Sequence, residues 1–85
     1  MQQVEIFTKS YCPYCLRAKE LLRIKGVDFV EHDVTTDPAM EEEMRVRSGR
    51  TTVPEIFIGG VLVGGCSELF DLDETGELDR LLTLR

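Results

Sequence analysis

The sequence predicts an α/β fold in which helices flank a four-stranded mixed sheet. An apolar run at residues 4–8 is followed by an amphipathic helical segment and by a second strand at residues 29–34, an order that pairs strands in parallel. Two further apolar runs, residues 56–58 and 61–63, are separated by Gly59 and Gly60, which indicates an antiparallel hairpin. The element order is β-α-β-α-β-β-α. With 85 residues, the chain is expected to form a single domain, residues 1–85.

The first helix carries clear start and stop signals. Pro13 suits the first helical position, which makes Cys12 the N-cap, and Gly26 is placed to end the helix in a left-handed conformation. One face has apolar spacing and is expected to be buried, and four charged residues are expected to be exposed. The buried set is Cys15, Ala18, Leu21 and Leu22, and the exposed set is Arg17, Lys19, Glu20 and Arg23.

The second half of the chain also contains residues that start and end helices and strands. Asp37, followed by Pro38, is an N-cap for a second helix, and Gly49 is its expected end. Gly64 and Gly65 interrupt the fourth strand. A last amphipathic region begins at about Ser67 and is broken near Gly76, so the final helix is expected to be discontinuous.

Composition narrows the classes of function. The net charge of −6 argues against nucleic acid as a partner, and no apolar stretch approaches the roughly 18 residues of a membrane helix. Three cysteines are too few for a secreted disulfide scaffold, so a reducing, cytoplasmic location is expected. Positive residues surround the dithiol in sequence and predict that an anionic substrate is attracted there: Lys9, Arg17, Lys19, Arg23 and Lys25.

Cys12 and Cys15 form a C-x-x-C pair at the predicted helix start. The thiolate is the nucleophile in thiol–disulfide exchange, and backbone N–H groups at a helix start lower the pKa of a cysteine placed there. Cys12 is therefore the expected attacking thiol. Cys15, one turn further in, is shielded but can resolve a mixed disulfide.

Three motifs together resemble the dithiol glutaredoxins, which have a thioredoxin-like fold. They are the segments at residues 11–15 (Tyr-Cys-Pro-Tyr-Cys), 51–54 (Thr-Thr-Val-Pro) and 64–67 (Gly-Gly-Cys-Ser), and the resemblance runs from Val4 to about Leu82. It implies a glutathione-dependent oxidoreductase that reduces protein disulfides and glutathione mixed disulfides. Glutathione is then the cosubstrate, no metal is needed, and ribonucleotide reductase is a possible client. The protein is expected to act as a monomer.

The resemblance also assigns a glutathione pocket. The Val53–Pro54 bond, which follows Thr52, is expected to be cis and to present the Val53 backbone to the cysteinyl unit of glutathione. Gly65 brings bare backbone up to the helix start, and the backbone N–H groups of Cys66 and Ser67 are expected to hold the γ-glutamyl end. Tyr14 lies at the rim of this pocket.

The residues expected near the glycine end of glutathione follow the family pattern less closely. By resemblance its glycine carboxylate falls near Lys9. The sequence departs from the family at Glu41, where relatives place arginine or glutamine, and a carboxylate there would repel that of the ligand. Arg45, one helical turn on, is the alternative cation.

Several alternatives stay open at this stage. Cys66 is expected to be a packing residue, with an oxidation site as the alternative. A redoxin reduced by a flavoprotein reductase would share the fold but would not use the glutathione motifs. A zinc site would require His32 to meet the three cysteines, and an iron–sulfur carrier normally lacks the proline found at position 13.

Overall fold

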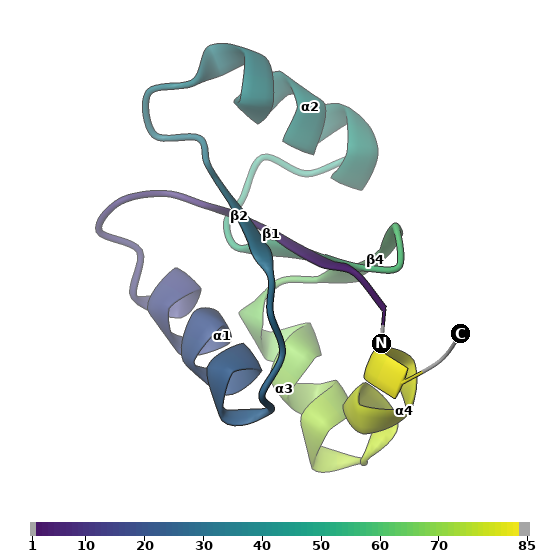
Figure 1. The fold of residues 1–85 in the computed structure, drawn as a ribbon. Helices are drawn as coiled ribbons and strands as arrows, with labels where there is room; N and C mark the ends of the chain where they lie inside the picture. Colours follow the sequence, from purple (N-terminus) through teal and green to yellow (C-terminus); the bar gives the residue numbers. More distant parts are fainter. Residues whose placement is uncertain (1, 84–85) are drawn as a thin grey trace.

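The fold is a central sheet between two layers of helices. The computed structural model describes residues 2–83, whose elements follow in the order β1 (Val4–Thr8), α1 (Pro13–Ile24), β2 (Val30–Asp33), α2 (Pro38–Ser48), β3 (Glu55–Ile58), β4 (Val61–Gly64), α3 (Cys66–Glu74) and α4 (Glu77–Thr83) (Figure 1). The strand order is β2-β1-β3-β4, with β2 parallel to β1 and the other pairs antiparallel. The mixed sheet predicted from the sequence is confirmed.

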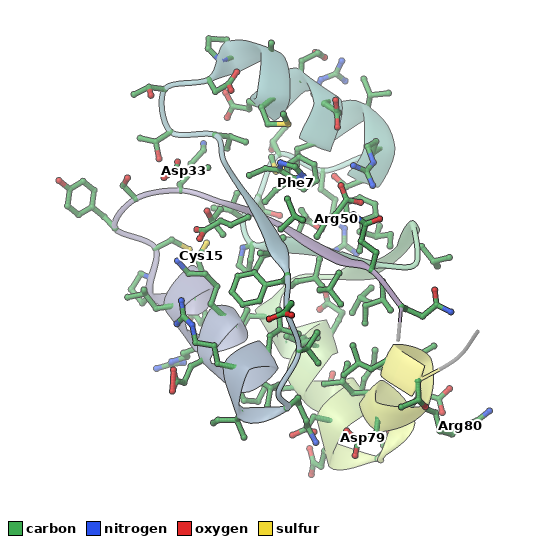
Figure 2. All side chains as sticks on the ribbon, viewed as in Figure 1. Phe7, Cys15, Asp33, Arg50, Asp79 and Arg80 are labelled. Carbon is green, nitrogen blue, oxygen red and sulfur yellow. The ribbon has the colours of Figure 1, made fainter. Side chains whose placement is uncertain are left out.

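Alternation along the two central strands produces two separate cores. In Figure 1, α2 covers one face of the sheet, and α1, α3 and α4 cover the other. Ile6 and Ile56 face the three-helix side and are fully buried. Phe7 and Phe57, the next residues along each strand, pack with Met44 of α2 on the other side, where Figure 2 labels Phe7. The strand period of two therefore fixes which helices each strand residue contacts.

The helix signals read from the sequence are confirmed. Cys12 is the N-cap of α1, and Gly26 follows that helix with a φ of +70°. Asp37 caps α2 by accepting a hydrogen bond from the Met40 N–H at 3.0 Å, and Gly49 ends α2 with a φ of +72°. The Cys12 cap fixes the start of α1, and with it the position of the dithiol.

Three details differ from the prediction. The β2 strand is limited to Val30–Asp33 and is shorter than the predicted strand at residues 29–34. The last helical region begins at Cys66, one residue early, whereas its break at Gly76 into α3 and α4 confirms the prediction. Lys19 is half-buried and not exposed, because its ammonium contacts Glu31 of β2 at 3.0 Å.

None of the helices formed by residues 2–83 combines the length and apolar character needed to cross a membrane.

Candidate active site

The dithiol lies where the loop after β1 enters α1. Cys12 is half-buried, and its Sγ accepts a hydrogen bond from the Cys15 N–H at 3.1 Å. This bond comes from the first turn of the helix, so the sulfur caps one of the N–H groups that have no partner within the helix. Tyr11, just before the dithiol, is fully exposed and has a φ of +62°. Figure 2 labels Cys15 at this end of α1.

The three thiols have different environments. Cys15 is only 1% exposed, and burial, with the contact to Cys12, raises the pKa of its thiol to about 12. Burial also raises the pKa of the Cys66 thiol. Cys12 is the one cysteine of the three that is not buried. An incoming disulfide therefore meets Cys12 first, and Cys15 stays protonated behind it.

A groove lined by residues of all three sequence motifs lies beside the dithiol, at the start of α3. The Val53–Pro54 bond is cis, as expected, and the Val53 carbonyl oxygen lies 3.9 Å from the Cys12 Sγ. The groove has a volume of about 350 Å³ and is lined by Tyr14, Arg50, Thr52, Val53, Pro54, Glu55, Gly65, Cys66, Ser67 and Glu68. Seven predicted pocket residues are among them, and the structure therefore brings the three sequence motifs together.

One wall of the groove is the N-terminus of α3. Glu68 accepts hydrogen bonds from the Gly65 N–H at 2.7 Å, the Ser67 hydroxyl at 2.7 Å and Arg50 at 3.1 Å. These three donors, the Gly65 N–H first among them, hold the pKa of Glu68 at about 2. A Cβ at Gly65 would lie 3.3 Å from the Pro54 carbonyl oxygen, so glycine permits the close approach of these two backbones.

Two groove residues, Arg50 and Glu55, were not singled out from the sequence. Glu55 begins β3 and its side chain is 1% exposed, although charged residues are rarely buried. Its Oε2 accepts a hydrogen bond from the Thr52 hydroxyl at 3.0 Å, and burial raises its pKa. The available signal for both residues was their position beside the Thr-Thr-Val-Pro motif.

Lys9 does not line this groove. Its Nζ lies 3.0 Å from Glu41, the residue at which the sequence departs from the family pattern. Arg45, the alternative cation, forms a two-pronged ion pair with Glu42. Lys9 and Arg45 are therefore each held by a neighbouring carboxylate of α2.

The other basic residues near the dithiol in sequence are also largely neutralised. Lys19 pairs with Glu31, Arg23 lies 3.9 Å from Glu20, and Lys25 contacts both Asp73 at 2.6 Å and Asp79 at 3.0 Å. Arg17 lies over the Tyr14 ring. Carboxylates distant in sequence fold onto most of these cations, so their combined field is weaker than the sequence suggests, and the attraction of an anionic substrate stays a prediction.

His32 has a place in the fold away from the three cysteines. Its ring contacts Glu5 at 3.2 Å and lies 4.8 Å from the Phe7 ring, centroid to centroid. Within residues 2–83 no three or more histidine, cysteine, aspartate or glutamate side chains are grouped so that they could hold a metal ion.

A shielded thiol behind an accessible one, at a helix start and beside a cis-proline loop, defines the dithiol oxidoreductases of thioredoxin-like fold. Comparison with known proteins narrows this class. The family model for glutaredoxin matches residues 4–63. The chain is 56% identical over 82 residues to Glutaredoxin 3 of Escherichia coli (strain K12), an alignment that covers 96% of this chain and 99% of that protein. The chain belongs to the glutaredoxin family.

Solved structures agree with this assignment. The solution structure of glutaredoxin from Brucella melitensis has 52% sequence identity and a TM-score of 0.84, and covers 96% of this chain and 89% of that one. The crystal structure of a buckwheat glutaredoxin–glutathione complex has 30% identity and a TM-score of 0.87, with coverage of 96% and 77%. The protein is a glutathione-dependent thiol–disulfide oxidoreductase, and glutathione is its cosubstrate.

Proposed function

We propose that Cys12 is the attacking thiol and Cys15 the resolving thiol in the reduction of protein disulfides. The Cys12 thiolate attacks one sulfur of the substrate, and the other sulfur leaves as a thiolate. Cys15 loses its proton and attacks the Cys12 sulfur, which releases the reduced product and forms the Cys12–Cys15 disulfide. Two glutathione molecules then restore the dithiol and leave as glutathione disulfide. The observation that carries this assignment is the difference in burial between the two cysteines.

Glutathione mixed disulfides require Cys12 alone. The Cys12 thiolate takes the glutathione sulfur and the protein thiol is released. A second glutathione then attacks the glutathione sulfur bonded to Cys12, which regenerates the Cys12 thiolate and forms glutathione disulfide. Cys15 contributes no bond to this route.

We place the tripeptide along the groove. The cysteinyl backbone pairs with the main chain of Val53, beside Cys12, as in strand addition. Thr52, Pro54 and Tyr14 form the surrounding walls.

The γ-glutamyl carboxylate binds the N–H groups of Cys66 and Ser67 at the start of α3, next to the N-cap Gly65. The glycine carboxylate extends toward Lys9, which must then share its ammonium with Glu41. This end of the ligand is therefore held less firmly than the γ-glutamyl end.

Protein clients approach over an exposed rim. Tyr11, Tyr14 and Leu16 are all exposed around the dithiol and give a protein substrate an apolar contact surface. We propose that the enzyme acts as a cytoplasmic monomer without a metal, and that ribonucleotide reductase is among the proteins it reduces.

Two variants test the assignment of roles. Reduction of a glutathione mixed disulfide is followed through NADPH consumption in the presence of glutathione and glutathione reductase, and reduction of a protein disulfide is measured in parallel. Cys12→Ser should abolish both activities, whereas Cys15→Ser should lose the second and retain the first. Loss of both activities in Cys15→Ser, with the variant still folded by circular dichroism, would show that the roles are wrong.

A further inference from the structure

The groove contains a buried carboxylate oxygen that lacks a donor. The Glu55 side chain is 1% exposed and lies among the residues that line the groove. Its Oε2 is bonded to the Thr52 hydroxyl, whereas its Oε1 has no hydrogen-bond donor among residues 2–83. Leaving a buried acceptor unpaired is unfavourable, and more so when the group is charged. An additional donor at Oε1 would therefore be favourable, and the groove is the space that Glu55 lines.

The cation nearest to this oxygen is already engaged elsewhere. The Arg50 Nη1 lies 3.9 Å from Glu55 Oε1, beyond hydrogen-bond distance, and donates to Glu68 at 3.1 Å. Arg50 is half exposed, whereas Glu55 is enclosed. Glu55 therefore keeps one carboxylate oxygen without a hydrogen-bond donor among residues 2–83.

We propose that Glu55 determines specificity by accepting a hydrogen bond from the ammonium group at the amino-acid end of the ligand. This inference rests on the proposed function, in which that end of glutathione lies at the start of α3. The amino-acid end of glutathione is a zwitterion. Its carboxylate is bound by the N-terminus of α3, and Glu55 of β3 would bind its ammonium.

Glu68 is the competing candidate for the same ammonium. Its two oxygens already accept from the Gly65 N–H, the Ser67 hydroxyl and Arg50. Three of the roughly four acceptor sites of this carboxylate are therefore in use, whereas Glu55 Oε1 has no hydrogen-bond donor at all among residues 2–83. The unpaired oxygen of Glu55 therefore gains more from an added donor, although both carboxylates line the same groove.

The charges in this part of the groove agree with the proposal. Glu55, Glu68 and Arg50 together carry one excess negative charge when both carboxylates are ionised, and a ligand ammonium would neutralise it. Burial raises the pKa of Glu55, which reflects the unfavourable environment of the charged form in the free protein. A bound ammonium would stabilise that charged form.

The test compares two chromogenic substrates that differ by one amino group. Each is a mixed disulfide with thiopyridine, made from glutathione or from glutaryl-cysteinylglycine, which lacks the α-amino group. The second-order rate of thiopyridone release by the reduced enzyme is measured for both. The wild type should prefer glutathione, and Glu55→Gln should reduce this preference by about 10- to 100-fold, the range expected for a hydrogen bond to a charged group. The rate with the des-amino substrate should hardly change.

Two further variants make the result specific. Glu74→Gln removes the same charge from an exposed position at the far end of α3 and should leave the preference unchanged. The proposal is overturned if Glu55→Gln slows both substrates equally or neither, as a purely structural residue would. It is also overturned if only Glu68→Gln removes the preference. The wild type is also assayed with the mixed disulfide of mercaptoethanol and thiopyridine. If it reacts with both peptide substrates no faster than with this compound, glutathione recognition itself is refuted.

Discussion

The reactivity of Cys15 is the sharpest quantitative expectation from the structure. Its thiol pKa is raised from 9.0 to about 12, chiefly by burial. At neutral pH this lowers the thiolate fraction about a thousandfold. Basicity raises the nucleophilicity of the remaining thiolate about 15- to 30-fold, for a Brønsted slope of about 0.4–0.5. In the folded protein Cys15 should therefore attack a small disulfide up to about 30- to 60-fold more slowly than an ordinary thiol.

The measurement uses Cys12→Ser, in which Cys15 must react directly. The variant is treated with a small aromatic disulfide at pH 7, both folded and in guanidinium chloride, and modification of Cys15 is followed by peptide mapping. Burial, the largest cause of the shift, remains in this variant, so the folded rate should stay well below the unfolded rate. Equal rates in the two states would refute the argument that Cys15 is held as a protected thiol.

Three other predictions concern stability. Arg47 and, less strongly, His32 hold the pKa of Glu5 at about 2 against an ordinary 4.5, so Glu5→Gln should lower the free energy of unfolding by up to about 3 kcal/mol at pH 7. This loss should shrink as the pH falls from 4.5 toward 2, because the wild type then loses the same interaction. Gly64→Ala should cost about 1–3 kcal/mol, since Gly64 has a φ of +121° and a Cβ would lie 2.5 Å from a Glu68 oxygen. The same change should slow the reaction with glutathione mixed disulfides. Leu69→Ala should cost about 2–5 kcal/mol, because this fully buried side chain joins α3 to the larger core.

Chemical denaturation measures all three losses. An effect of Glu5→Gln that is unchanged between pH 7 and pH 3 would contradict its assignment to the carboxylate. A fully stable Gly64→Ala would show that the backbone tolerates a side chain there, and a Leu69→Ala loss below 1 kcal/mol would mean that the core refills the cavity.

The elements and the dithiol were predictable because local chemistry determines them. The N-caps Cys12 and Asp37 and the left-handed Gly26 and Gly49 act within one helical turn, so the sequence alone indicates where the helices begin and end. The alternation of the central strands is equally local. These features place Cys12 at a helix start without any knowledge of the rest of the fold.

Contacts between residues distant in sequence could not be predicted from local sequence signals. The contact of Lys9 with Glu41 and that of Lys19 with Glu31 depend on which helix covers which face of the sheet. Burial of Glu55 depends likewise on the approach of α3 to the loop before β3, although nothing in its local pattern distinguishes it from a surface glutamate. Periodicity describes an element in isolation, and these contacts arise only after the elements pack.

The aromatic residues beside the dithiol have a practical consequence. The chain contains no tryptophan and only two tyrosines, Tyr11 and Tyr14, which stand on either side of Cys12. Tyrosine fluorescence of the protein therefore originates entirely from residues beside the reacting sulfur in the sequence. Closing or opening the bond between Cys12 and Cys15 changes the surroundings of both fluorophores, so oxidation can be followed optically in the unlabelled enzyme.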